Sequence, residues 1–538
     1  MAFFGVTSIL DANCLQKDLI FLFMTDISAN NTRIAKNTLL LYFRMLFMMI
    51  VSLYTSRVVL NALGVEDFGI YNIAGGIITM FSFLNSAMSS STQRYITFEL
   101  GKEDHRQLHK VFRTSVNIHL LIALFILILG ETVGLWFLYE KMIIPPARMY
   151  AAFWVYQFSV INMMVMIISV PYNATIIAHE KMSAFAYISL AEVLLKLGIV
   201  YLLYLTQYDK LIFYTALLCG MQLLICIIYN CYCRHHFEET CYDWIWDSKL
   251  FKEMIGFAGW NLWGGCAFIF FTQGLNILLN MFFGPVVNAA RGVAVQVQGA
   301  VVQFSTNFQT ALNPQITKSY AIGDFIYMHN LIFRSSKFTF LLLATISFPL
   351  ILETDMILRV WLKIVPDYTV AFVRLMLGIT IIDAMAGSLM VAAQATGRIR
   401  FYQSMVGGVL LFIVPISYIV LRLGAAPWSV FVVHFCICIF AFIIRLLIIR
   451  SMIHLSLYRY FHQVVLRCLW VLLLATPLPI VLFYVLPNTF VVNIFICVIC
   501  VFMMLLFSYF VGLTVNEKVY FEKKVIFLKN RFKEFRNI

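Results

Sequence analysis

Charged residues inside apolar stretches are the first feature of this sequence that could do chemistry. Arg44 and Arg291 each lie in a long apolar run with no acidic residue three or four positions away. Such an arginine needs a partner from elsewhere, and its planar fork matches the oxygens of a phosphate. Two interpretations fit each residue: contact with an anionic ligand, or extension of the side chain to the headgroups of a bilayer.

Two further carboxylates lie in apolar runs. Glu192 and Lys196 are four residues apart, so on a helix they share a face and can neutralise each other. This pair fits a structural role and equally a role in coupling to an ion. Asp383 and Arg374 are about half a turn out of phase on a helix, so each needs a separate partner. Arg374 can extend toward the headgroups, which leaves Asp383 as the second candidate for ion coupling.

Amide side chains gather in two neighbouring apolar stretches, 255–282 and 288–312. In the first stretch one helix face carries Gln273, Asn276 and Asn280, and in the second stretch one stripe carries Gln296, Gln303, Asn307 and Thr310, with Arg291, Gln298 and Gln309 on nearly the opposite side. One stripe would line a wet cavity and the other would bond to a neighbouring helix; the sequence leaves open which, and helix–helix contacts alone also fit. The candidate cavity residues are Arg44, Lys196, Arg291, Gln273, Asn276, Gln296, Gln303 and Asn307, with Glu192 and Asp383 as coupling or structural residues.

Enzyme and metal motifs fit this sequence poorly. A group of cysteines and histidines follows the sixth apolar stretch, at Cys231, Cys233, His235, His236 and Cys241. It lacks the CxxC spacing typical of zinc sites, so we expect neither a metal nor a cofactor. No Walker A motif, nucleophile elbow or HExxH motif occurs. We therefore expect no enzymatic activity, and any driving energy would come from gradients.

The composition indicates which elements position these residues. Of the 538 residues, 62% are hydrophobic and 12% are charged, whereas soluble domains carry about 25% charged residues. This excludes soluble enzymes and nucleic-acid binders, and it predicts an all-α polytopic membrane protein of about 14 spans. The predicted spans are 38–57, 68–92, 114–138, 149–177, 183–206, 211–231, 255–282, 288–312, 337–357, 370–395, 401–421, 428–449, 466–486 and 490–513.

The basic residues predict an orientation. Most of the 39 Lys and Arg residues fall in segments on one side of the predicted spans, and such segments face the cytoplasm. Both termini are then cytoplasmic, and the net charge of +13 reflects topology rather than a nucleic-acid partner. The tail 514–538, basic and rich in Phe, fits binding to anionic headgroups and also fits a solvated helix. Met1 and Met24 both fit as the start.

A weak internal repeat relates the two halves of the chain. Gly64 matches Gly284, Gly101 matches Gly323, Phe112-Arg113 matches Phe333-Arg334 and Glu131-Thr132 matches Glu353-Thr354, all at offsets close to 220 residues. Six spans per repeat place both halves in the same orientation, with a pseudo-twofold axis along the membrane normal. The predicted organisation is 1–35 cytoplasmic segment, 36–231 N-lobe, 232–253 interlobe linker, 254–451 C-lobe, 452–513 two further spans and 514–538 basic tail.

Two segments carry a resemblance to a known family. The run from Asn288-Ala-Ala-Arg291-Gly292 to Gln296, continuing through Asn313-Pro314-Gln315, is similar to Wzx-type polysaccharide flippases of the multidrug/oligosaccharidyl-lipid/polysaccharide exporter superfamily. The segment from Leu63 to Tyr71 resembles the same group. The resemblance covers about residues 30–515, and the run beginning at Asn288 is its most specific part.

The resemblance implies that an undecaprenyl-pyrophosphate-linked oligosaccharide, such as an O-antigen or capsule repeat unit, crosses the bacterial cytoplasmic membrane by alternating access. Arg44 and Arg291 match in kind the arginines that related lipid II flippases carry in spans one and eight. The implied partners are the lipid-linked oligosaccharide, membrane lipids and a polysaccharide polymerase, with the protein itself a monomer. Two alternatives stay open: an ion-coupled multidrug exporter of the same superfamily, which Glu192 and Asp383 would serve, and a non-transporting scaffold for polysaccharide assembly.

Overall fold

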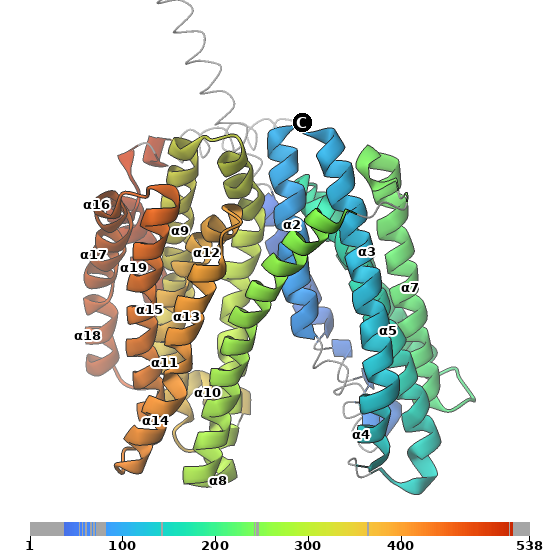
Figure 1. The fold of residues 1–538 in the computed structure, drawn as a ribbon. Coiled ribbons are helices and arrows are strands. Elements are labelled where there is room, and N and C mark those ends of the chain that lie inside the picture. Colours follow the sequence, from blue (N-terminus) through green and yellow to red (C-terminus); the bar gives the residue numbers. More distant parts are fainter. Residues whose placement is uncertain are drawn as a thin grey trace, which may run out of the picture.

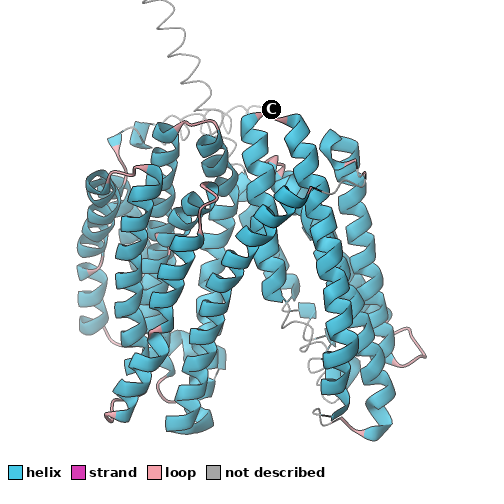
Figure 2. Cartoon of the chain, in the orientation of Figure 1, coloured by secondary structure: helices cyan, strands magenta, loops and turns pink. Residues whose placement is uncertain are grey.

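The computed structural model describes residues 37–519 apart from 53, 56–57, 60–61, 65–66, 68–69, 72–81, 141–143, 242, 244–246, 363–364 and 516. These described residues form helices joined by short turns, with no strand among them (Figure 2). The predicted segment 1–35, most of the tail 514–538 and part of the second predicted span lie outside the described residues.

The helices follow one another with few interruptions. The first half contains the helix Asn37–Ser52, α2 (Ser82–Lys102), α3 (His105–Leu129), η1 (Gly130–Gly134), α4 (Leu135–Glu140), η2 (Pro146–Arg148), α5 (Met149–Ala178), α6 (Met182–Leu202), α7 (Lys210–His236) and η3 (Glu238–Thr240). The second half contains α8 (Ser248–Ala321), α9 (Phe325–Leu352), α10 (Thr354–Leu362), α11 (Thr369–Asp383), α12 (Ala386–Ala395), α13 (Arg400–Leu411), α14 (Ile413–Arg422), α15 (Ser429–Ile453), α16 (Leu457–Tyr460), η4 (Phe461–Val465), α17 (Leu466–Ala475), α18 (Pro477–Val485), α19 (Phe490–Phe507) and η5 (Ser508–Gly512).

Length and composition identify the membrane spans. Among the described residues ten helices are long and apolar enough to cross a membrane, or eleven if the bent pair α11 and α12 is one span. The prediction of an all-α polytopic membrane protein is therefore confirmed. The other predicted spans correspond to the shorter helix Asn37–Ser52, to α2 and to the part of α8 after Gly284, where polar side chains replace apolar ones.

The 74-residue helix α8 is two spans joined at a sharp kink. Gly284 has φ 78° and ψ −172° within an otherwise helical segment. A residue with a Cβ rarely adopts this backbone conformation, so glycine permits the turn. The break falls between 282 and 288, where the sequence predicts the end of one span and the start of the next.

The helices form two bundles that lean against each other (Figure 1). The first contains α2, α3, α5, α6 and α7, and the second contains α8–α15, with α17 and α19 packed against α9. The turns 103–104, 179–181 and 322–324 lie at the top of Figure 1, and we call this side of the protein the upper end. The bundles meet there and diverge toward the opposite, lower end. The exact lobe boundaries, 36–231 and 254–451, stay a prediction.

The internal repeat is visible in the backbone. Left-handed residues recur in matching places, at Gly64 and Gly284, at Glu103 and Gly323, and at Glu180 and Gly397. Helices α3 and α9 also begin alike, because the side chains of Asp104 and Asp324 each accept a hydrogen bond from the backbone N–H three residues later. The two halves therefore share turn geometry even where their side chains differ.

An ion pair fastens the last described residues to the second bundle. The carboxylate of Glu517, which follows η5, lies 2.5 Å from the buried ammonium group of Lys337 in α9 and 3.8 Å from Arg334. Burial alone would raise the pKa of Glu517, but its ion pair with Lys337 holds the pKa below the ordinary value. The last two spans are thus anchored to α9 by charge as well as by apolar packing.

Candidate functional site: a cavity between α2 and the second bundle

A cavity lies where α2 meets the second bundle, and its lining is apolar over most of its area with polar side chains interspersed. Its volume is about 830 Å³, within the usual range for small-molecule sites. Residues of α2 line one side, and residues of α8, α11, α12, α13 and α15 line the other. Its polar lining residues are Ser86, Ser90, Asn261, Gln298, Ser305, Thr306, Gln309, Thr380, Asp383, Gln394, Tyr402, Gln403, His434 and Arg445.

Amide groups form a connected patch in this lining. The side-chain carbonyl of Asn261 accepts hydrogen bonds from the amide groups of Gln394 (3.3 Å) and Gln403 (3.1 Å). Nearby, Gln298 donates to the hydroxyl of Thr380 at 2.9 Å. Each of these amides has both a donor and an acceptor, so the patch can exchange hydrogen bonds with a ligand in either direction.

The structure separates the two polar stripes of residues 288–312. Gln298 and Gln309 line the cavity. The other stripe is not part of its lining: the side chains of Gln296 and Gln303 are exposed elsewhere, and Asn307 is buried. The candidate cavity residues Gln296 and Gln303 therefore lie outside this cavity.

The carboxylate of Asp383 is paired inside the cavity. Arg445 of α15 donates to Asp383 at 3.2 Å, and the two side chains are 14% and 56% exposed respectively. Arg374, on the same helix as Asp383, instead donates to the backbone carbonyls of Ile351 and Leu352 at the end of α9. The expectation of separate partners is confirmed. The role of Arg445 was missed because the sequence places it near the cytoplasmic end of its span.

Arg44 bridges three helices from both bundles. Its guanidinium donates to the hydroxyl of Ser189 in α6 (3.2 Å) and to the side-chain carbonyl of Asn307 in α8 (3.1 Å). The same group lies 4.4 Å from the ring centroid of Phe185. Its described hydrogen-bond partners are neutral, and the carboxylate of Glu192 attracts it electrostatically. An anion that displaces one of the neutral partners would meet the guanidinium directly.

Arg291 is used within α8. Its side chain is 97% buried, being 3% exposed, and it donates to the side-chain carbonyl of Asn276 and, at 2.7 Å, to the backbone carbonyl of Thr272. Asn276 in turn donates to Gln273 at 2.8 Å. These predicted site residues do come together, but they join the two arms of α8 across the kink at Gly284 rather than lining the cavity.

Glu192 and Lys196 form the expected pair. The ammonium group of Lys196 lies 2.6 Å from the carboxylate of Glu192 on α6. Neither residue lines the cavity described above. Lys196 therefore already has a directly bonded anionic partner, whereas the same carboxylate attracts Arg44 without a hydrogen bond among the described contacts.

Contacts at the upper end join the bundles, and the sequence did not single them out. Arg94 of α2 donates to the backbone carbonyls of Gln394 (3.2 Å) and Ala395 (3.0 Å) at the end of α12. Glu180 accepts hydrogen bonds from Gln315 (2.8 Å) and Lys318 (3.1 Å) of α8. These contacts hold the two bundles together at the upper end.

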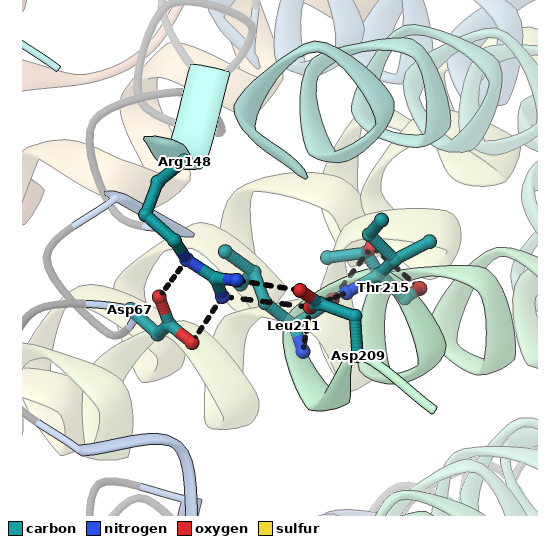
Figure 3. A network of polar contacts seen from close by, with 6 residues as sticks. Asp67, Arg148, Asp209, Leu211 and Thr215 are labelled. Atoms are coloured by element: carbon teal, nitrogen blue, oxygen red, sulfur yellow. Dashed lines mark hydrogen bonds and ion pairs between the residues drawn. The ribbon is translucent and has the colours of Figure 1, made fainter. Parts of the chain in front are cut away.

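The lower end of the first bundle is held by a separate network (Figure 3). The guanidinium of Arg148 lies between the carboxylates of Asp67 (2.8 Å) and Asp209 (2.5 Å). Burial alone would raise the pKa of Asp209, but hydrogen bonds from Arg148 and from the N–H groups of Ile212 and Leu211 hold it below the ordinary value. The network ties Asp67 to the starts of α5 and α7, and none of its three charged residues lines the cavity.

Several proteins of known structure share the overall arrangement of helices. The outward-facing conformation of a multidrug resistance MATE family transporter of the MOP superfamily aligns with a TM-score of 0.68 at 12% identity, covering 79% of this chain and 96% of that one. MATE in the straight conformation aligns with a TM-score of 0.65 at 13% identity, covering 79% and 96%.

A third neighbour is a MOP superfamily transporter from Pyrococcus furiosus, described by the reverse polarity of its binding pocket, with a TM-score of 0.57, 13% identity and 78% and 96% coverage. No protein-family model and no curated protein sequence matches the chain. The finer resemblance to Wzx-type flippases stays a prediction. The chain has the fold of the MATE-type transporters of the MOP superfamily.

Proposed function

We propose that this protein moves an undecaprenyl-pyrophosphate-linked oligosaccharide from the cytoplasmic to the periplasmic leaflet of the bacterial cytoplasmic membrane. A pyrophosphate and many hydroxyl groups cannot cross hydrocarbon unassisted, because each loses its hydrogen bonds to water. The observation that carries the proposal is the cavity beside α2, in which amides and hydroxyls are interspersed within a lining that is mostly apolar. Such a lining can replace the water around sugar hydroxyls.

Arg44 is the proposed contact of the pyrophosphate. A phosphate carries negative charge, so the Coulomb attraction adds to its hydrogen bonds with a guanidinium, whereas an amide or a hydroxyl offers only its dipole. The pyrophosphate would therefore displace the neutral Asn307 and Ser189 from Arg44. Because Asn307 belongs to the other bundle, this exchange would couple substrate binding to separation of the bundles. The polyprenyl chain would stay in the surrounding lipid.

The direction of access follows from the predicted orientation. With the upper end in the cytoplasm, the contacts of Arg94 and Glu180 hold the bundles together on the cytoplasmic side, and the bundles diverge toward the periplasm. Breaking these contacts would expose the cavity to the inner leaflet. We propose that the protein acts as a monomer and that the substrate enters from the inner leaflet. A polysaccharide polymerase would then receive the substrate on the periplasmic side.

Ion-coupled multidrug export is the second candidate. It is favoured by the Asp383 side chain, which is 56% exposed and lines the cavity, where a cationic drug or an ion could reach it. Against it, Asp383 is already neutralised by Arg445, and Glu192 by Lys196. A free embedded carboxylate, as a cation exporter needs, is thus lacking at these two positions.

Complementation tests the proposal. A strain that lacks its own polysaccharide flippase would receive the wild-type protein, Arg44→Ala, Arg44→Lys or Arg291→Ala, with membrane levels checked by blot. We expect the wild type to restore surface glycan and Arg44→Ala to reduce it at least about tenfold, since a charge-assisted contact is lost. Arg44→Lys, which keeps the charge, should retain part of the activity.

The matched control is Arg359→Ala, because Arg359 is an exposed arginine paired with Asp355 away from the cavity. Full rescue by Arg44→Ala would remove Arg44 from the proposed mechanism. Failure of the wild type with several glycans, together with resistance to cationic drugs, would favour the exporter. Failure in both assays would favour an assembly scaffold.

A further inference from the structure

The charges that line the cavity are balanced. Among its lining residues there is one carboxylate, Asp383, and one guanidinium, Arg445, and they contact each other at 3.2 Å. The imidazole of His434 also lines the cavity, with its ring centroid 5.0 Å from that of Phe271. Arg44 and Arg291 are not part of the lining. The lining of the cavity therefore carries no net charge from its carboxylate and guanidinium, whereas the proposed pyrophosphate site at Arg44 is positively charged.

Two glycines allow the cavity's amides to lie close to the helices. A Cβ at Gly264 would lie 2.2 Å from the side-chain oxygen of Gln403, and a Cβ at Gly387 would lie 2.2 Å from the side-chain nitrogen of Gln309. Any other residue at either position would push the amide away. The side chains of Gln309 and Gln403 thus occupy space that a side chain at Gly387 or Gly264 would otherwise fill.

The free hydrogen-bonding capacity of this lining suits hydroxyl groups. A hydroxyl both donates and accepts, and so does each amide of the patch around Asn261. Gln394 and Gln403 are each more than nine-tenths buried, so their orientations are fixed by packing. The more exposed carboxylate of Asp383 offers an additional acceptor, while Arg445 balances its charge.

Building on the proposed function, we propose that this cavity binds the glycan part of the substrate and selects sugars without net charge. The Asp383–Arg445 pair is the selecting element. An acidic sugar meets the exposed Asp383 carboxylate, which repels it, while Arg445 is already engaged. An amino sugar or an organic cation must compete with Arg445 for Asp383. Neutral sugars need only hydrogen bonds, which the amides supply.

Binding of three probes to the purified full-length protein in lipid nanodiscs tests this selection. The probes are maltotetraose (neutral), tetragalacturonate (anionic) and fully deacetylated chitotetraose (cationic). The binding of each probe is measured by saturation-transfer-difference NMR. We expect the wild type to bind maltotetraose at least about tenfold more tightly than either charged probe, because unfavourable charge contacts cost several kcal/mol.

Variants of the pair predict the sign of the change. Asp383→Asn leaves Arg445 unbalanced and should gain affinity for tetragalacturonate, whereas Arg445→Gln frees Asp383 and should gain affinity for chitotetraose. The double variant D383N/R445Q is neutral and avoids an unpaired buried charge, so it tests the proposal even if a single variant does not fold. The double variant should gain affinity for neither charged probe. It should bind maltotetraose about fivefold more weakly, because it has lost a charged acceptor.

The matched control is D355N/R359Q, which removes an exposed carboxylate–arginine pair on α10 and should leave all three affinities unchanged. Equal or tighter binding of a charged probe by the wild type would overturn the proposal, as would the absence of binding of any probe. Neutral-sugar binding without complementation of any flippase-deficient strain would leave this inference standing and reject the proposed function instead.

Discussion

The carboxylate of Glu180 lies 3.1 Å from the ammonium group of Lys318, and this ion pair joins the first bundle to the second. The side chain of Glu180 is only 1% exposed, and Gln315 donates to its second oxygen at 2.8 Å. Glu180 has a left-handed backbone with φ 58°, which costs a residue with a Cβ about 1 kcal/mol. Strain of this kind persists where surrounding contacts hold it, so the pair specifically stabilises the arrangement in which the upper end is closed.

Neutralising this pair should open the upper end. Glu180→Gln keeps a hydrogen bond to Gln315 but loses the attraction to Lys318, and we expect a loss of about 1–2 kcal/mol of the closed state because Lys318 is partly exposed. Distances between spin labels at the exposed residues Arg106 and Ile326 would show a larger population of the separated state. The charge-reversed variant E180K/K318E should recover the closed population, and no difference between these two variants would contradict the assignment.

A close approach of backbones at the upper end makes a second prediction. A Cβ at Gly101 would lie 2.9 Å from the Cβ of Ala321 and 3.1 Å from backbone atoms of Lys318. Gly101→Ala should therefore push the bundles apart, although alanine favours a helix by about 1 kcal/mol. The same spin-label distances would report it. Gly256→Ala, where a Cβ meets no atom within 4 Å, should leave the distances unchanged.

The interlobe linker should make stability sensitive to acid. Burial alone would raise the pKa of Glu239, but the hydrogen bond to His179 (2.5 Å) holds it below the ordinary value. A carboxyl that is more acidic when folded stabilises the protein above its unfolded pKa, about 4, and this stabilisation is lost as pH falls through the folded pKa. We expect the thermal midpoint to fall on acidification more steeply in the wild type than in Glu239→Gln.

The neighbouring Glu238 provides the control for that experiment. It lies in the same short helix but is exposed, so Glu238→Gln should keep the wild-type pH dependence. Identical pH profiles for Glu239→Gln and the wild type would show that the contact with His179 does not contribute to stability.

Substitution of a single glycine should alter the cavity without altering the fold. In Gly387→Ala the added methyl group would displace the side chain of Gln309, because its ideal position is 2.2 Å from that amide. We expect transport of a neutral glycan to fall about tenfold, the effect of a misplaced polar contact, at unchanged membrane levels. Gly220→Ala, in open space on α7, should transport normally. Equal activity of both variants would argue that Gln309 does not contact the substrate.

The helices were predictable because their signal is local. Long apolar runs identify the spans, and charged residues mark their ends. The arm of α8 after Gly284 was predicted as a span of its own, and the structure shows it as a helix that is not among those apolar enough to cross a membrane. The repeat was detectable for a related reason: turns that need special backbone geometry, as at Gly64 and Gly284, preserve their position when packed surfaces diverge.

The site was predictable only in its residue types. Periodicity distinguishes the stripe of Gln298 and Gln309 from the stripe of Gln296 and Gln303, but nothing local says which one faces the cavity. That choice depends on how α8 is rotated against α2 and α11. The partners Arg445 and Lys318 were missed for the same reason, because ion pairs between helices distant in sequence arise only from the assembled packing.

The contact between Lys337 and Glu517 has a practical consequence for watching the protein work. Because this pair and the packing of α17 and α19 on α9 attach the last described helices to the second bundle, a fluorophore placed at the exposed Val519 would travel with that bundle as a rigid reporter. A second fluorophore on α7 would move with the first bundle. Energy transfer between the two would then follow the working cycle in real time, with neither dye attached to a residue that lines the cavity.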